Sequence, residues 1–184
     1  MFIKPSIILS SIILLLLIYA CEKPRPINQE EIINRIELHL TDSKGKSYEV
    51  RYFDEDGEGT KEPVADTLFI PSGEHFTCYI ALFNTLVTPT ANITSEIAEE
   101  SAEHQFFYLT GPGSGLEFSY DDEDMMNHPI GLRFKLSSGG AESEKLNIIL
   151  RHMPDKTAQY VMSGDITNAG GETDIDIIIP VVVK

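Results

Sequence analysis

Two acidic segments carry the side chains best suited to chemistry. In the first, Asp54, Asp56 and Glu58 alternate, and Gly57 lies among them. Calcium binds hard carboxylate oxygens, and glycine lets the backbone bend tightly enough for such groups to converge. The match to an EF-hand loop is partial, because counting from Asp54 places Ala65 where a bidentate glutamate is needed. We predict a weak Ca²⁺ site here, with a dissociation constant of about 10⁻⁴ to 10⁻³ M; the alternative is a solvated turn.

The second acidic segment, residues 121–124, has more charge but no glycine until Gly131. Its aspartates Asp122 and Asp124 are the candidate Ca²⁺ ligands. The alternative is again a solvated connection between strands. Both acidic segments fall between predicted strands, so they can lie together at one end of a folded domain.

No residue pattern typical of catalysis is present. Five histidines occur, at His39, His75, His104, His128 and His152. None has a metal-ligand spacing such as HExxH. We expect His104 and His152 to be ordinary hydrogen-bonded residues; zinc or haem ligation is an alternative that no motif supports. Residues 111–115 are glycine-rich but precede a predicted strand and lack lysine, unlike a phosphate-binding loop. Ser114 is not a nucleophile elbow, because Pro112 and Leu116 stand at the flanking glycine positions. We expect no enzymatic activity; a hydrolase using carboxylates of both acidic segments is the less favoured alternative.

The beginning of the chain is typical of an export signal. Lys4 gives a positive start, residues 7–18 are almost wholly apolar, and Ile18–Cys21 resembles a lipoprotein cleavage site. The apolar run is too short to span about 30 Å of hydrocarbon comfortably. We predict that residues 1–20 are a signal peptide and that Cys21 becomes the lipid-bearing first residue. A transmembrane anchor and an ordinary secretory signal are the alternatives.

A lipidated cysteine predicts where the protein resides. A cysteine with three acyl chains exceeds the two lipid signals needed for stable anchoring, so the protein should stay on a membrane. We expect an outer-membrane location, facing the periplasm or the cell surface. The lipidated Cys21 and the proline-containing segment that follows, 21–31, form a tether, and 32–184 form one domain.

Charge and cysteine usage narrow the partners. The formal net charge is −15, and residues 1–20 contain only one charged side chain, Lys4. Such a domain repels nucleic acid, so a cationic protein or a divalent ion is the natural complement. Once Cys21 is lipidated, Cys78 has no partner for an intrachain disulfide. Its place in an alternating apolar pattern predicts a buried core residue.

Hydrophobic alternation with a period of two runs through most of the domain. In 36–40, for example, isoleucine and leucine alternate with polar residues, as in a half-buried strand. One stretch, 94–104, favours a short helix. About eight or nine short strands with turns at roughly ten-residue spacing predict an all-β fold. We expect a two-sheet antiparallel sandwich, immunoglobulin-like in general shape, with a small β-barrel as the alternative.

Several segments together resemble a family of small lipoproteins of Bacteroidota. They are residues 29–33, 54–57, 102–107, 120–132, 150–156 and 170–175. The family's second acidic loop reads Asp-x-Asp-x-Asn-Gly-x-Pro; Asp122, Asp124 and Pro129 match, whereas Met126 and Asn127 replace Asn-Gly. Relatives are sometimes labelled "type 1 periplasmic binding fold". That fold needs two α/β lobes and about twice this length, whereas this chain predicts strand after strand.

The resemblance implies organism group and location rather than an activity. Asp66-Thr67-Leu68 resembles the short O-glycosylation motif of Bacteroidota, which makes Thr67 a candidate modification site. We expect a non-enzymatic binding or accessory module of the cell envelope, serving an outer-membrane receptor or another envelope protein. A purely structural role in protein–protein interaction is the alternative.

Overall fold

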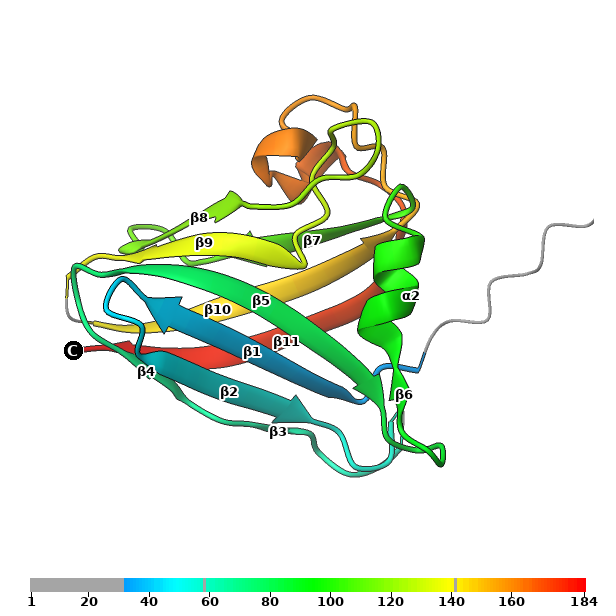
Figure 1. The fold of residues 1–184 in the computed structure, drawn as a ribbon, viewed down its shortest axis with the longest axis horizontal. Helices are drawn as coiled ribbons and strands as arrows, with labels where there is room; N and C mark the ends of the chain where they lie inside the picture. Colours follow the sequence, from blue (N-terminus) through cyan, green and yellow to red (C-terminus); the bar gives the residue numbers. More distant parts are fainter. Residues whose placement is uncertain (1–31, 58, 141) are drawn as a thin grey trace, which may run out of the picture.

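Two β-sheets face each other across an apolar interior in the computed structural model (Figure 1). The structure describes residues 32–57, 59–140 and 142–184. The predicted signal peptide, the lipidation site Cys21 and the candidate ligand Glu58 therefore lie outside the described residues. The predicted all-β sandwich is confirmed, and the sheets do not close into the alternative barrel.

The larger sheet has the strand order β3-β2-β1-β5-β9-β8, and the short β6 also pairs with β5. Its strands, in chain order, are β1 (Arg35–Asp42), β2 (Ser47–Phe53), β3 (Val64–Ala65), β5 (His75–Asn84), β6 (Ala91–Asn92), β8 (Leu116–Tyr120) and β9 (Arg133–Ser138). All of these pairs are antiparallel. β8 is therefore an edge strand of this sheet.

The smaller sheet has the order β4-β11-β10-β7. Its strands are β4 (Leu68–Ile70), β7 (His104–Leu109), β10 (Ser143–His152) and β11 (Glu172–Val183). The β11–β4 pair is parallel, an exception to the predicted antiparallel pairing, because β4 belongs to the crossover that leads from one sheet to the other. The edge strand β7 lies on the same side of the sandwich as β8.

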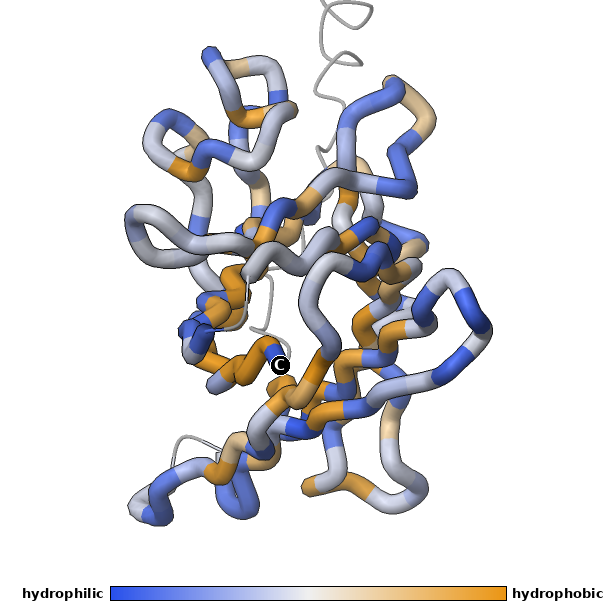
Figure 2. Tube along the Cα trace, turned by 90° about the vertical axis from the view of Figure 1, so that its left-hand side faces the viewer, coloured by the Kyte–Doolittle hydropathy of each residue, from blue (hydrophilic) through white to orange (hydrophobic). Residues whose placement is uncertain are grey.

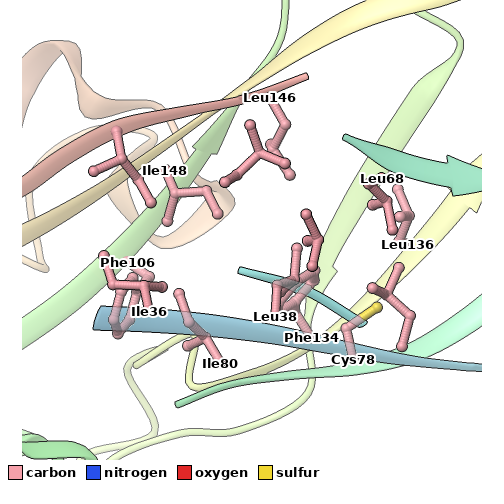
Figure 3. Close-up of a cluster of buried hydrophobic side chains, with 14 of the residues drawn as sticks. Ile36, Leu38, Leu68, Cys78, Ile80, Phe106, Phe134, Leu136, Leu146 and Ile148 are labelled. Atoms are coloured by element: carbon pink, nitrogen blue, oxygen red, sulfur yellow. The ribbon is translucent and has the colours of Figure 1, made fainter. Parts of the chain in front are cut away.

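The core follows directly from the alternation in the sequence. Side chains of one parity on each strand point inward, because successive residues of a strand face opposite sides. Figure 3 shows them meeting between the sheets, with Leu38 of β1 and Cys78 of β5 opposite Leu146 and Ile148 of β10. Figure 2 shows the apolar stretches along the strands and the hydrophilic residues gathered in the connecting loops.

Strand β11 differs from its sequence-based expectation. Its aliphatic run predicts a strand covered on both faces, yet Ile178 is 49% exposed and Asp176 is exposed too, so that expectation is wrong. Pro180 lies where pairing with the short β4 stops. Val183 N donates to Glu142 O, so the backbone N–H and C=O groups of the even-numbered residues of β11 face away from β10. The missing N–H of Pro180 therefore removes no hydrogen bond to that strand.

The single α-helix of the described residues is α2 (Ile93–Glu99), shorter than the predicted 94–104. Ile93 and Ile97 are buried against the sheet, and the helix stands at one end of the sandwich (Figure 1). The hydroxyl of Thr94, in the first turn of α2, bonds the backbone of Leu82 on β5. No helix within 32–57, 59–140 or 142–184 is long and apolar enough to cross a membrane.

The segment between β10 and β11, residues 153–171, folds back over the outer face of the smaller sheet, and we call it the cap. It contains two 3₁₀ helices, η2 (Val161–Ser163) and η3 (Ile166–Asn168). Val161 and Ala169 of the cap pack with Phe107 and Ile149 in a second apolar cluster. The cap, orange in Figure 1, lies beside the loop that joins β8 to β9.

Candidate functional site

A buried lysine joins the cap to the loop between β8 and β9, residues 121–132. Lys156 is only 4% exposed. Its ammonium donates to Asp124 Oδ2 at 3.1 Å, Pro129 O at 3.0 Å and Ser101 O at 2.7 Å. Burial lowers its pKa, while Asp124 acts in the opposite direction. Three acceptors satisfy the three donors of an ammonium group, as a buried charge requires.

Asp124 also organises its own loop. Its Oδ1 accepts hydrogen bonds from Met126 N at 2.8 Å and His128 N at 3.0 Å. Burial alone raises the pKa of Asp124, but these amides and the ammonium of Lys156 outweigh it and hold the pKa below its usual value. The carboxylate is therefore occupied by neighbours within the described fold.

Asp122 has a similar role at the end of the loop. Its two oxygens accept from Gly131 N at 2.7 Å and Arg133 N at 2.8 Å. Burial raises its pKa, against the lowering effect of those amides. Gly131 has φ +89°, and a Cβ there would lie 2.8 Å from Phe106 Cβ, so only glycine lets the loop rest on β7. Asp122 and Asp124 thus bind backbone amides separately rather than converging.

The first acidic loop, residues 54–63, is built differently. Asp56 Oδ2 accepts from Thr60 N at 2.9 Å and Lys61 N at 3.2 Å, and Asp54 Oδ1 accepts from Asp56 N at 3.3 Å. Lys61 pairs with the exposed Glu55 at 2.8 Å. Asp56 Oδ1 is shut off from solvent and has no hydrogen-bond partner among the described residues. The structure thus brings Asp54 and Asp56 together.

The two acidic loops do not meet. The first loop follows β2 and the second follows β8, and these two strands finish at the same end of the larger sheet. However, β1, β5 and β9 lie between them. Within the described ranges, no group of three or more His, Cys, Asp or Glu side chains is arranged to hold a metal ion. The Ca²⁺ hypothesis for the first loop stays a prediction.

An aromatic pocket of about 220 Å³ opens between the edge strands β7 and β8. Its lining is Tyr108, Thr110, Leu116, Phe118, Ser119, Tyr120, Ser163 and Gly164. The rings of Tyr108 and Phe118 are stacked, with centroids 5.6 Å apart and an interplanar angle of 11°. The cap forms the far wall through Ser163 and Gly164.

A second pocket, of about 450 Å³, lies on the other side of Tyr120. Its lining is Tyr120, Asp121, Asp122, Glu123, Asn127, Pro129 and Met162. Asp121 pairs with Lys135 at 2.5 Å, and Glu123 is exposed. We call the two hollows the aromatic pocket and the acidic pocket. Because Tyr120 lines both, one bound molecule can occupy them together.

Tyr120 is held firmly between the sheets. Its hydroxyl donates to Phe106 O at 2.7 Å and accepts from Gln105 Nε2 at 3.1 Å. Burial raises the pKa of Tyr120 to about 12, so the phenol stays protonated at neutral pH. It serves as a fixed wall rather than as an acid–base group.

Exposed methionines surround this end of the molecule, a feature that the sequence reading missed. Met125 is fully exposed, Met126 is 71% exposed, and Met153 and Met162 are about half exposed. Tyr160 of the cap is 62% exposed. Methionine is flexible and polarizable, and it suits surfaces that adapt to a partner. The Met125-Met126 pair is visible in the sequence, but the sequence alone does not show that these residues are exposed at the same end of the molecule as Met153 and Met162.

His104 and His152 form a stacked pair that sequence spacing did not reveal. They stand opposite each other in the β7–β10 register, with ring centroids 4.8 Å apart. His104 Nε2 lies 3.7 Å from Asp174 Oδ2, and His152 Nε2 lies 3.6 Å from Glu103 Oε2. Burial lowers the pKa of His104. The pair links the strand ends beneath the cap.

Two further predictions concern single residues. Cys78 is 1% exposed, so its assignment to the core is confirmed, and burial raises the pKa of its thiol to about 12. Thr67 lies half-buried in the connection between β3 and β4. Its modification stays a prediction.

Comparison with known proteins adds no relative: no protein-family model, curated protein or solved structure matches this chain. The two pockets around Tyr120 are therefore interpreted from their own geometry.

Proposed function

We propose that this protein is a lipid-anchored, extracytoplasmic binding module, and that it holds a protein partner at the two pockets around Tyr120. The observation that carries this proposal is the pairing of an aromatic pocket with an acidic one on loops held in place by Lys156. Binding residues are characteristically found on loops fixed to a rigid scaffold.

A non-enzymatic role fits the chemistry of the pockets. Asp122 is engaged by backbone amides, and the phenol of Tyr120 is fully hydrogen-bonded. A general base needs a free basic atom within reach of the proton that it removes. The pockets offer shape, aromatic surface and negative charge, which are the elements of recognition rather than of bond breaking.

Anchorage at Cys21 and the acidic charge restrict the partner. A lipid-bearing cysteine and a tether over 21–31 would hold the domain near the outer membrane, in line with the resemblance to Bacteroidota lipoproteins. The net charge of −15 disfavours nucleic acid and favours a basic protein surface. An outer-membrane receptor or another envelope protein is the proposed partner.

We also propose that the first acidic loop binds Ca²⁺ weakly. Support comes from Asp54, whose carboxylate accepts from the backbone amide of Asp56, and from Asp56 Oδ1, which has no hydrogen-bond partner among the described residues. An ion there would stabilise the loop without taking part in chemistry. The second loop gives less support, because its carboxylates bind amides and Lys156.

Photo-crosslinking in living cells tests the proposed function. A photoreactive residue at Met162, beside the acidic pocket, should capture an envelope protein, whereas one at Ser72, in the turn between β4 and β5, should not. Mass spectrometry of the mature amino terminus should find acylated Cys21. Equal capture from both positions, or an intact Met1, would contradict the proposal.

A further inference from the structure

We propose that the partner binds as an extended, basic segment that adds a strand to the edge of β8. One apolar side chain of the segment would enter the aromatic pocket, and a lysine or arginine would reach the acidic pocket. This inference rests on the proposed function, since it names the chemistry of the partner for the same site.

The first argument is the free backbone of β8. This strand pairs only with β9, and Asp121 N donates to Arg133 O. Hydrogen-bonding direction alternates along a strand, so the amides and carbonyls of Phe118 and Tyr120 point away from β9. Within the described ranges no backbone group pairs with them. The edge is thus a template for another strand.

The neighbouring edge strand, β7, is closed by contrast. Phe106 N donates to Ile130 O at 2.7 Å, and Phe106 O accepts from the hydroxyl of Tyr120 at 2.7 Å. Tyr120 of β8 and the loop that follows it therefore occupy the outward backbone groups of Phe106, at the middle of β7. An incoming segment would therefore form backbone hydrogen bonds with β8, while its side chains would contact both β7 and β8.

The size of the aromatic pocket selects the kind of occupant. About 220 Å³ is smaller than the roughly 300–1,000 Å³ typical of small-molecule sites. It has room for a single large apolar side chain, packed beside Phe118 and against the ring of Tyr108. In β-strand addition, backbone bonds supply affinity and pockets for alternate side chains supply specificity.

Charge complementarity identifies the partner as basic rather than as a second copy. Asp121 and Glu123 are exposed at the acidic pocket, and Glu117 is exposed on β8 itself. Pairing two β8 edges of this chain would gather the carboxylates of both copies at one interface, which is repulsive. A segment with lysine or arginine next to its apolar side chain is instead attracted to these carboxylates.

Peptide display against the full chain in detergent provides the first test. Panning a library of random twelve-residue peptides should enrich sequences with β-favouring residues, one large apolar residue and nearby lysine or arginine. Failure to enrich peptides, or enrichment of acidic or helix-favouring ones, would overturn the proposal.

Hydrogen exchange resolved to single amides gives the sharpest readout with an enriched peptide. Binding should slow exchange at Phe118 and Tyr120, whose amides face outward. Exchange at Glu117 and Ser119, whose amides face β9, should be slow before binding and change little. A uniform change along β8, or none, would rule out strand addition.

Two variants and two matched controls test the pockets without touching the core. Ser163→Trp fills the aromatic pocket, and Glu123→Lys reverses charge at the acidic pocket. Each should weaken peptide binding about tenfold or more. Ser47→Trp and Glu62→Lys, at exposed positions on β2 and in the first acidic loop, should leave binding unchanged, because β1, β5 and β9 separate β2 from β8. Equal effects of variants and controls would contradict the inference.

The two proposals fail separately. A protein captured at Met162 that docks through a helix or an acidic surface would overturn strand addition and leave the binding function standing. Peptide binding at β8 together with a chain that carries no lipid would overturn the envelope function and leave the chemistry of the site standing.

Discussion

The two acidic loops look alike in sequence and differ in the fold. In the loop between β8 and β9, Asp122 and Asp124 bind backbone amides, and Asp124 also binds the buried Lys156. In the first loop, Asp56 binds two amides, and its other oxygen has no hydrogen-bond partner in the part of the chain that the structure describes. Acidic composition therefore does not tell whether a carboxylate holds a loop together or is available to a ligand.

The difference comes from what covers each loop. The cap lies against the second loop and brings in Lys156, a residue 32 positions along the chain from Asp124. In the first loop the nearby cation is Lys61, which pairs with Glu55 at the exposed surface. Burial makes the same kind of ion pair strongly structural in one place and nearly neutral in the other.

Removing the buried cation should have the largest effect. Lys156→Ala leaves Asp124 charged, buried and deprived of its counter-ion, which costs about 3–5 kcal/mol of unfolding free energy. Urea unfolding measures the loss. Lys61→Ala, the matched change in the first loop, should give no measurable change. Equal losses in the two variants would erase the distinction between the loops.

Replacing the acceptor at the other end of the second loop should cost less. Asp122→Ala leaves the amides of Gly131 and Arg133 without their acceptors, a loss of about 1–3 kcal/mol. Asp122→Asn, which keeps one carbonyl oxygen, should fall between the wild type and the alanine variant in urea unfolding. Asp54→Ala is the matched control, and an effect as large as that of Asp122→Ala would contradict this reading.

Acid should act on His104, beneath the cap, and on Asp56 of the first acidic loop in different pH ranges. Burial holds the pKa of His104 below its usual 6.5, so the unfolded chain takes up this proton first and stability falls as pH drops below about 6.5. His104→Gln should flatten that part of a melting-temperature profile. The pKa of Asp56 is lowered from 3.8, because the amides of Thr60 and Lys61 outweigh burial. Asp56→Asn should therefore flatten the slope of the profile only below about pH 4; a changed slope near pH 6 would contradict the assignment.

Calcium should produce the smallest effect. At millimolar concentration it should raise the melting temperature of the wild type by a few degrees, as expected for a weak site. Asp54→Ala and Asp56→Ala should abolish the shift, whereas Glu123→Ala should keep it. No shift in the wild type would remove the Ca²⁺ hypothesis for the first loop.

The candidate site could be predicted only in part. Asp122 and Asp124 were singled out from their charge, but their partners are set by folding. The stacked pair of His104 and His152 needs the β7–β10 register, which no local spacing reveals. The place of Tyr120 as a wall shared by both pockets could not be predicted, because it depends on the cap.

By itself, the sequence determined the all-β class, the inward-facing positions and the burial of Cys78, because period-two alternation is a local property of a strand. Tertiary structure decided that β11 is exposed at Ile178, that Lys156 meets Asp124, and that β8 keeps a free edge. These outcomes depend on which distant segments pack together. Alternation states which face of a strand is apolar, but not which neighbour will cover it.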